Sequence, residues 1–297
     1  MRIVVSGASG LIGTALLPQL RAHGHTVIRL VRRPPAHSDE LAWDPRTGEF
    51  DPAVWVDVDA VINLSGAGVG DRRWTASYKQ EILDSRVDTT RAIAEAIAGL
   101  ERKPEVLINA SAIGWYGETG QRAVDESDRG GDDFLADVCR AWEEATAPAQ
   151  NAGIRTVFLR TGLVMDSHGG ALARMIPLFR AGIGGRLGNG QQWWSWISLR
   201  DEIRAILQLL TSEIGGPVNL VSPNPVTNQE FTAALARALH RPALLPVPAF
   251  ALRIALGGFS TEVLGSKRIL PKVLTENGFT FSDPHVFPTL ESQVQHP

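Results

Sequence analysis

Three glycines, each three residues from the next, are the first residues in this sequence of 297 residues whose spacing indicates a binding site. They follow the apolar run Ile3–Ser6 and precede an amphipathic stretch that extends to about Ala22. A glycine turn between a buried strand and a helix lets the main chain approach a phosphate, and the helix N-terminus offers unpaired N–H groups to the anion. A plain tight turn is the alternative. The pattern favours a dinucleotide site made by Gly7, Ser9, Gly10, Leu11, Ile12 and Gly13.

Two arginines stand where the next expected strand, Thr26–Val31, ends. A carboxylate at this position normally bonds the ribose 2′-hydroxyl of NAD. Here Val31 is followed by Arg32 and Arg33, and the next carboxylate along the chain is Asp39. Guanidinium groups attract a 2′-phosphate that a carboxylate would repel. The sequence therefore predicts NADP(H), bound in part by these three residues, with a solvated basic turn as the alternative.

A second turn of small residues follows the apolar run Ala60–Leu64. A flat ring or a ribose has room to lie against main chain that carries such short side chains. We therefore expect Leu64, Ser65 and Gly66 to contact the cofactor. A tight strand-to-loop turn explains the pair Gly66 and Gly68 less fully, because one glycine would be enough.

Together with the segment Asn109–Gly117, these turns resemble those of extended short-chain dehydrogenase/reductases. More narrowly, the whole chain resembles an atypical subgroup, the epimerase family, which is related to nucleoside-diphosphate-sugar epimerases and carries a C-terminal DUF1731-type segment. The resemblance implies a Rossmann domain with NADP at the glycine loop and a C-terminal substrate lobe, and it implies no settled physiological substrate. The partner expected is a small-molecule substrate, either a carbonyl compound or a sugar-like molecule. The narrower match includes Arg160–Gly162, Gly169–Leu172, Trp194–Ile197, Pro223–Asn228, Arg268–Pro271 and Asn277–Phe279.

The resemblance also implies a catalytic serine, tyrosine and lysine, and this chain departs from that pattern. In the usual set the tyrosine is the general acid/base, and a lysine four residues later lowers its pKa. The corresponding segment, 132–151, contains neither residue type. Alignment on Glu143 places Leu135 at the tyrosine position and Cys139 at the lysine position. A leucine has no proton to give, and a thiol carries no standing positive charge.

Three residues remain as catalytic candidates: Ser111, Tyr116 and Cys139. Ser111 lies at the strand end where the family serine is expected, although counting back from Tyr116 puts Ala112 there instead, and a strand-end cap is the alternative. Tyr116 is the tyrosine nearest the expected site, the other being Tyr78. Cys139 is the sole cysteine, and a lone cysteine is more often a small core residue.

Two residues of the segment 76–99 are candidates for contact with the cofactor. Arg86 stands where relatives often carry asparagine, and its guanidinium suits the cofactor's phosphate or ribose, or an anionic substrate. Glu81 resembles a family position that reaches the cofactor. A solvated helix face with a local ion pair is the alternative for both residues.

Four of the 8 tryptophans form an unusual concentration of indoles: Trp193, Trp194 and Trp196, with Trp115 on another loop. Indole walls suit flat or sugar-ring ligands and keep water away from a hydride. Core packing between two lobes is the alternative, since indoles are usually highly buried.

Apolar runs alternate with helical patterns through the first two-thirds of the chain, which predicts an α/β fold with a Rossmann-type, doubly wound parallel sheet. After Leu220, prolines break short segments, and a smaller α+β lobe is expected with a helix at Asn228–Leu239 and an edge strand at Phe279–Phe281. The domains expected are an NADP-binding domain at 1–220, with contributions to the substrate lobe from about 165–200, and a substrate lobe at 221–297. Further helices are expected at Leu11–Ala22, Ala76–Gly99, Asp133–Asn151, Ala171–Ala181 and Arg200–Thr211, and further strands at Glu105–Ala110, Thr156–Leu159 and Val218–Val221.

Composition and charge argue against several classes of partner and site. A net charge of −3, with no basic run longer than an arginine pair, disfavours nucleic acid and membrane surfaces as partners. The histidines show no metal-ligand spacing, so no metal site is expected. One cysteine and an immediate first strand fit a reducing, cytoplasmic location. The helical segments 76–99 and 133–151 offer a face for a homodimer.

Two hypotheses about function follow from the sequence. The first is an NADP(H)-dependent oxidoreductase or epimerase-like enzyme that works without the usual tyrosine and lysine. The second is a catalytically silent NADP(H)-binding sensor or interaction protein. The missing pair favours the second hypothesis, whereas the intact second lobe and its tryptophans favour the first.

Overall fold

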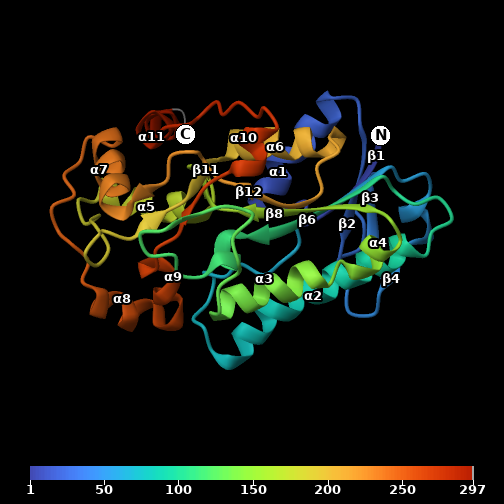
Figure 1. Cartoon of the computed structure of the whole chain (residues 1–297), viewed down its shortest axis with the longest axis horizontal. Coiled ribbons are helices and arrows are strands. Elements are labelled where there is room, and N and C mark those ends of the chain that lie inside the picture. Colours follow the sequence, from blue (N-terminus) through green and yellow to red (C-terminus); the bar gives the residue numbers. More distant parts are fainter. Residues whose placement is uncertain (296–297) are drawn as a thin grey trace.

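An eight-stranded sheet runs through the centre of the computed structural model, which describes residues 1–295 (Figure 1). Its strand order is β12-β8-β6-β5-β1-β2-β3-β4, and all neighbouring strands are parallel except the pair β3 and β4. This arrangement confirms the predicted Rossmann-type α/β fold. The strands are β1 (Arg2–Ser6), β2 (Thr26–Val31), β3 (Glu40–Asp44), β4 (Glu49–Phe50), β5 (Ala60–Asn63), β6 (Val106–Ala112), β8 (Arg155–Thr161) and β12 (Gly216–Leu220).

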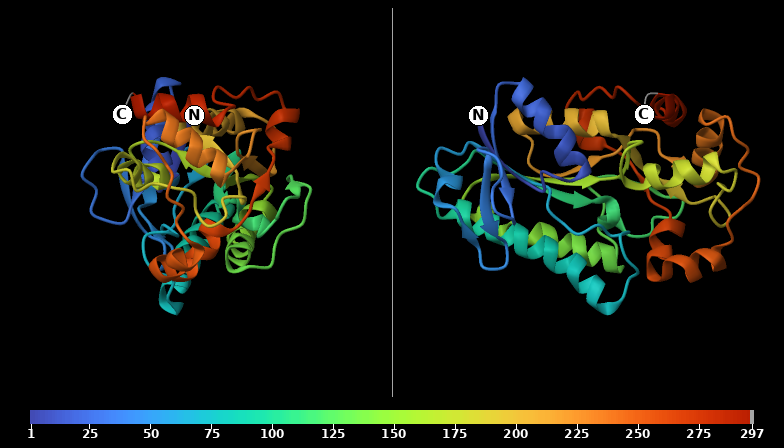
Figure 2. Two further views of the ribbon diagram at one scale, coloured as in Figure 1. Left: turned by 90° about the vertical axis from the view of Figure 1, so that its left-hand side faces the viewer. Right: turned by 180° about the vertical axis from the view of Figure 1, so that it is seen from behind.

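Helices cover both faces of the sheet because successive strand residues point to opposite sides. Ile3 and Val5 pack in the core that α1 (Leu11–Ala22), α6 (Leu199–Thr211) and α10 (Lys272–Glu276) complete. Val4, between them, packs in the second core, with α2 (Ala76–Ala98) and α4 (Ala147–Asn151). Helix α3 (Phe134–Glu144) runs beside α2 on this second face, as the view from behind also shows (Figures 1 and 2).

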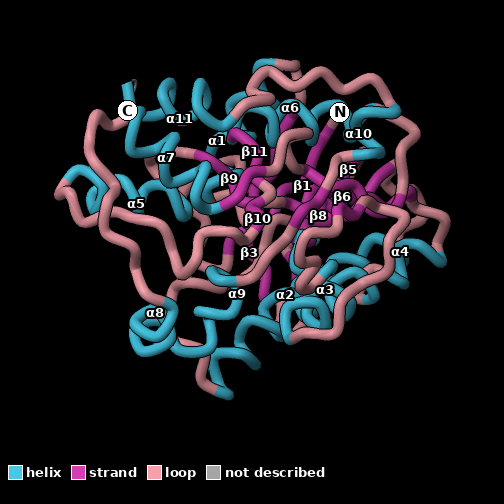
Figure 3. Tube along the Cα trace, turned by 60° about the vertical axis from the view of Figure 1, so that its left-hand side comes forward, coloured by secondary structure: helices cyan, strands magenta, loops and turns pink. Residues whose placement is uncertain are grey.

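The second lobe lies beyond the carboxyl ends of the central strands (Figure 1), and its helices lie to one side of the sheet (Figure 3). It has its own core, which includes Trp196 and Phe231. Its helices come from two distant parts of the chain. Helix α5 (Gly170–Arg180) packs in this core with α7 (Asn228–Ala238) and α11 (Val286–Gln295). The lobe is completed by α8 (Ala249–Leu256), α9 (Ser260–Leu264) and the short strands β7 (Ala123–Val124), β9 (Leu163–Met165), β10 (Trp193–Trp194), β11 (Trp196–Ser198), β13 (Val226–Thr227) and β14 (Arg268–Ile269).

Two expectations about the elements are wrong. The helix expected at 133–151 is two helices, because α3 ends at Glu144 and α4 begins at Ala147 with Pro148 in its first turn, where proline is tolerated. The segment Phe279–Phe281 forms no strand. Instead the Phe279 N–H donates to the carbonyl of Leu274 at the end of α10 and closes that helix, and the rings of Phe279 and Phe281 meet edge to face at 4.8 Å.

A buried ladder of polar side chains crosses the sheet directly below the glycine turn. The Ser6 hydroxyl donates to Asn63 Oδ1 at 2.5 Å, and Asn63 Nδ2 donates to Asn109 Oδ1 at 2.7 Å and to Thr90 Oγ1 at 2.9 Å. The Trp142 indole N–H donates to the same Thr90 oxygen at 2.9 Å. These bonds join β1, β5 and β6 to α2 and α3 through groups that have no access to water.

The Asn63→Ala variant should therefore lose stability, because it removes three buried hydrogen bonds and leaves the Ser6 hydroxyl without its acceptor. We expect the free energy of unfolding to fall by about 2–4 kcal/mol in urea denaturation. Asn151→Ala, at an exposed position at the end of α4, is the matched control and should stay within about 0.5 kcal/mol of the parent. Equal losses in the two variants would contradict a structural role for the ladder.

Candidate active site

The glycine turn packs main chain against main chain. Gly7 has a φ of +69°, and a Cβ there would lie 2.5 Å from the carbonyl carbon of Leu64. A Cβ on Gly13 would lie 2.5 Å from the carbonyl oxygen of Gly7. Both positions therefore exclude every side chain, which brings the start of α1 against the turn that follows β5.

The first turn of α1 is open toward this junction. Gly10 caps the helix without a side-chain hydrogen bond, and no acidic residue lies in the first turn. The N–H groups of Leu11, Ile12 and Gly13 have no hydrogen-bond acceptor among residues 1–295. Such a terminus carries a partial positive charge and free donors, so it fits the pyrophosphate of a dinucleotide.

The two arginines after β2 differ in their surroundings. Arg33 makes a bidentate pair with the carboxylate of Glu40, at 2.9 and 2.6 Å, so its charge is already compensated. Arg32 is exposed and makes no hydrogen bond or ion pair within the described part of the chain. Of the predicted pair, Arg32 is thus the guanidinium left available for a 2′-phosphate.

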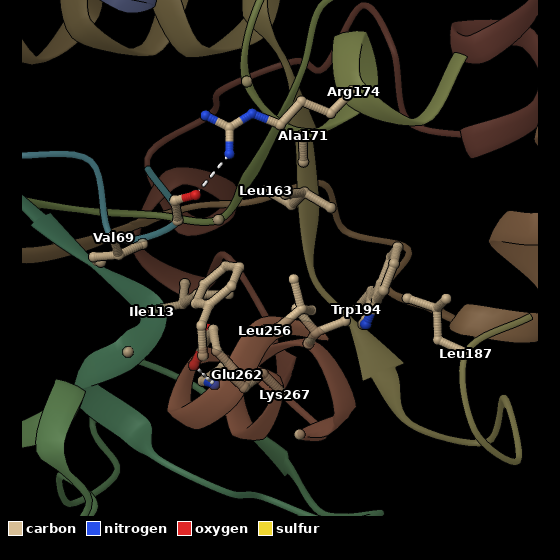
Figure 4. A pocket seen from close by; sticks show the side chains of 18 of the residues that line it. Val69, Ile113, Leu163, Ala171, Arg174, Leu187, Trp194, Leu256, Glu262 and Lys267 are labelled. Atoms are coloured by element: carbon tan, nitrogen blue, oxygen red, sulfur yellow. Dashed lines mark hydrogen bonds and ion pairs between the residues drawn. The ribbon is translucent and has the colours of Figure 1, made fainter. Parts of the chain in front are cut away.

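A cavity of about 680 Å³ opens where the carboxyl ends of β6 and β8 meet the second lobe. Figure 4 shows its wall, with Ile113 on one side, Leu163 and Trp194 on another, and Leu256 from α8 below. The cavity wall is mostly apolar, which matches the usual lining of small-molecule sites.

Three residues that were aligned with the usual serine, tyrosine and lysine positions line this cavity together: Ala112, the alternative to Ser111, with Leu135 and Cys139. A Cβ on Gly114 would lie 3.2 Å from Leu135 Cβ and 3.5 Å from Cys139 Sγ, so the two α3 side chains sit directly over the chain after β6. Burial raises the pKa of the Cys139 thiol to about 12. The thiol therefore keeps its proton at neutral pH and is no activated nucleophile.

Ser111 and Tyr116 lie elsewhere, and their predicted place in the site finds no support in the geometry. Alternate residues of β6 point to opposite sides, so Ala112 faces the cavity and Ser111 faces Glu143. The Ser111 hydroxyl donates to Glu143 Oε1 at 2.7 Å, and Arg160 pairs with both oxygens of that carboxylate at 2.9 Å.

Tyr116 belongs to the same buried network. Its hydroxyl accepts from Arg160 Nη1 at 3.1 Å and donates to Asn219 Oδ1 at 2.7 Å. Burial raises the pKa of Tyr116 to about 12. The Tyr116 hydroxyl therefore links the chain after β6 to β8 and β12. Tyr116 does not line the cavity.

Arg86, in contrast, lies in the wall beside Cys139. Its Nη1 donates to the carbonyl of Ile82 at 2.9 Å, and its guanidinium lies 4.8 Å from the centroid of the Trp142 ring. Burial lowers the pKa of Arg86, and no carboxylate among residues 1–295 forms an ion pair with it. A Cβ on Gly66 would lie 3.2 Å from its Cζ, so the guanidinium touches the turn after β5.

The remaining predicted residues divide between the wall and the surface. Glu81 is exposed, pairs with Arg72 at 3.0 Å and does not line the cavity, which is the local ion pair named as its alternative. Leu64 and Ser65 form the turn beside Gly7. Trp193 and Trp194 line the cavity, whereas Trp196 is fully buried and Trp115 lies under the Arg160 guanidinium at 3.9 Å.

Sequence reasoning missed one buried ion pair in the wall, between Glu262 of α9 and Lys267. Lys267 Nζ lies 2.6 Å from Glu262 Oε2 (Figure 4). Burial lowers the pKa of Lys267, but the attraction of Glu262 outweighs it and the pKa is raised. A single lysine five residues after a glutamate has no spacing that marks it as a site residue, so nothing in the sequence pointed to it.

Comparison with known proteins decides the family. The family model described as the NAD dependent epimerase/dehydratase family matches residues 3–221. This chain belongs to that family. A domain of unknown function, DUF1731, matches residues 247–293. The predicted relationship to the epimerase family and the predicted C-terminal segment are both confirmed.

Relatives and solved structures of the family cover nearly the whole chain. Epimerase family protein ML0860 of Mycobacterium leprae is 50% identical over 94% of this chain and 91% of its own. The chloroplastic SDR39U1 homolog of Arabidopsis thaliana is 38% identical over 99% of this chain and 87% of its own. The crystal structure of human epimerase family protein SDR39U1 (isoform 2) with NADPH is 30% identical, with a TM-score of 0.93 and full coverage of both chains. MoeE5, in complex with UDP-glucuronic acid and NAD, shares the fold at 20% identity, with a TM-score of 0.79 over 99% of this chain and 98% of its own.

Residues 1–295 contain neither a metal-binding cluster nor a membrane-spanning helix. No group of three or more histidine, cysteine, aspartate or glutamate side chains is placed to hold a metal ion. No helix in this range combines the length and the apolar character that crossing a bilayer requires.

One buried carboxyl lies directly behind the cavity wall of this family member. Thr161 lines the cavity, and its hydroxyl donates to Glu202 Oε1 of α6 at 2.8 Å. The second oxygen, Oε2, has no partner within the described residues. Burial raises the pKa of Glu202 from 4.5 to about 8, so the folded chain holds this carboxyl neutral at pH 7.

The raised pKa of Glu202 makes the stability of the fold depend on pH. Above pH 4.5 the unfolded chain releases the Glu202 proton while the folded chain keeps it, so stability falls as the pH rises toward 8. Glu202→Gln should remove this loss, raising the free energy of unfolding at pH 8 by up to about 4 kcal/mol, at roughly 1.4 kcal/mol per pKa unit. The difference should shrink toward zero near pH 4.5, as measured by urea unfolding across that range. Glu213→Gln, exposed after α6, is the control and should show no such pH dependence.

Proposed function

We propose that this chain is an NADP(H)-dependent oxidoreductase with its substrate in the cavity. The observation that carries the proposal is Arg86, a half-buried guanidinium without a carboxylate partner among the described residues, placed in the wall beside Cys139. A buried charge is costly unless a counter-charge or hydrogen bonds compensate it. Arg86 is therefore built to meet an electron-rich group of a ligand.

The residues at the other end of the site fit NADP(H). Gly7 and Gly13 leave main chain where a Cβ would collide, the α1 terminus offers three free N–H donors, and Arg32 is an unpaired guanidinium after β2. The human relative that was crystallised with NADPH supports the same cofactor here. NADP(H), when bound, supplies or accepts a hydride at the carbon of the substrate.

The chain's own part in the reaction is electrostatic. Leu135 and Cys139 offer neither a proton at neutral pH nor a charge, so they supply only apolar contact beside the reacting centre. Arg86 supplies, from α2, the positive charge that a lysine on α3 supplies in the usual set. Its N–H donors stabilise the negative charge that develops on a carbonyl oxygen, and the proton that completes the alcohol comes from water.

A catalytically silent NADP(H)-binding sensor is the second candidate. The observation that favours it is the presence of Leu135 and Cys139 at the two positions where proton chemistry is expected. An absorbance screen of NADPH oxidation against a panel of carbonyl compounds separates the two candidates. Turnover of any member supports the enzyme, whereas tight NADPH binding without turnover, together with ligand-dependent capture of a partner, supports the sensor.

Replacing Arg32 should reveal which cofactor the site prefers. Arg32→Ala removes the free guanidinium, so we expect calorimetry to show NADPH binding weakened about tenfold, which is roughly 1.4 kcal/mol, and NADH binding unchanged. Arg46→Ala removes the same charge at an exposed turn and should alter neither affinity. An equal loss for both cofactors in Arg32→Ala would exclude a 2′-phosphate contact.

Replacing Arg86 tests the electrostatic role. Arg86→Met keeps much of the shape but loses the charge, so kcat/KM for a substrate from the panel should fall about 100-fold. Arg86→Lys should restore part of that loss, since a cation returns. Arg91→Met, at an exposed position on the same helix, is the matched control. A normal rate in Arg86→Met would remove this guanidinium from the mechanism.

A further inference from the structure

We infer that the substrate is an elongated apolar carbonyl compound, and not a nucleotide sugar. The inference rests on the proposed function for the carbonyl group alone, whereas the apolar body follows from the cavity itself. Beyond its inner end the cavity is walled by large aliphatic and aromatic side chains from α5, α8 and the loops between them: Leu178, Phe179, Ile183, Leu187, Val247, Leu252 and Leu256.

The charges in the wall leave no place for a diphosphate. Arg174 is paired with Asp71 at 2.8 Å, and Lys267 is paired with Glu262 at 2.6 Å. Arg86 is thus the unpaired cation in the wall among the described residues. One guanidinium suits one polar head, while the two phosphates of a nucleoside diphosphate would each need charge-assisted donors. We place the carbonyl at Arg86 and the apolar body along the α5–α8 wall.

The apolar lining continues onto the surface. Seven large apolar side chains are exposed in residues 1–295, and six of them belong to α5, α8 or the loops next to these helices: Leu178, Ile183, Leu244, Leu245, Phe250 and Ile254. Leu178 and Ile183 belong both to the exposed set and to the wall. A soluble chain rarely gathers exposed apolar side chains without a ligand or partner to cover them, so the cluster marks an entrance for an apolar molecule.

Helix α8 shows the same feature within one element. Leu252 and Leu256 face the cavity, while Phe250 and Ile254 are 65% and 70% exposed. A helix that is apolar on opposite faces is ordinarily buried on both. Here the inner face lines the cavity, while Phe250 and Ile254 on the outer face are exposed and free to contact an apolar molecule. The loop 183–187 closes the other side, where a Cβ on Gly185 would lie 1.7 Å from the Leu245 carbonyl oxygen.

Displacement of a fluorescent polyene fatty acid, cis-parinaric acid, from the cofactor-free protein tests the inference. Its fluorescence should rise on binding with a stoichiometry of about one, decanal should displace it, and UDP-glucuronic acid should not. Ile183→Asp, which puts a carboxylate at the entrance, should weaken probe binding about tenfold. Val56→Asp carries the same change at the seventh exposed position, away from the cavity, and should leave binding unchanged.

The outcomes separate this inference from the proposed function. Displacement by UDP-glucuronic acid, failure of decanal to displace, or equal effects of Ile183→Asp and Val56→Asp would overturn the apolar substrate. NADPH oxidation is measured separately on the same preparation. If decanal displaces the probe but no apolar carbonyl compound is reduced, the oxidoreductase proposal fails while the apolar site stands.

Discussion

The contact between two stretches of bare main chain is the constraint on which the site depends. Gly7 meets the turn after Leu64, and Gly13 meets Gly7, at distances that leave no room for any Cβ. This contact fixes the start of α1 at the carboxyl ends of β1 and β5, with three N–H groups free. Below it, the polar ladder from Ser6 through Asn63 to Asn109 holds the same strands in register. Without that alignment neither the cofactor end nor the cavity end of the site would have a fixed position.

The strand period of two explains why the counted positions and the observed site differ. At the end of β6 a shift of one residue moves a side chain from the cavity to the opposite face. Ser111 and Ala112 are neighbours, yet one belongs to the Glu143–Arg160 network and the other to the cavity wall. Ser111 and Tyr116 were predicted as site residues because their side chains are polar. In the structure both hydroxyls are buried and bonded to other side chains. Position along the strand, and not residue type, decides which one meets a ligand.

Local patterns were enough for the fold class and for the bounds of its first elements. The run Thr26–Val31 and the helix Leu11–Ala22 have the bounds that the apolar spacing predicted, because strand and helix periods depend on neighbours in sequence. Three features could not be predicted in this way: the Arg33–Glu40 ion pair, the Glu262–Lys267 ion pair, and the lack of a carboxylate partner for Arg86 among the described residues. Each depends on which distant side chain lies within about 3 Å, and only the packing of separate elements determines that.

The positive charge in the cavity wall comes from a different helix than in the usual catalytic set. Where relatives are expected to place a lysine on α3, this chain places the thiol of Cys139, and the guanidinium of Arg86 enters the same wall from α2. Moving the cation to a neighbouring helix keeps one positive charge beside the turn after β5 but removes the proton relay that a tyrosine and lysine form together. A site with one unpaired cation, a protonated thiol and aliphatic walls suits the proposed hydride transfer to a polarised, apolar molecule better than proton abstraction from a sugar hydroxyl. The exposed apolar side chains of Leu178 and Ile183 in the cavity wall agree with that preference, because a hydrophilic sugar gains no binding free energy from contact with them.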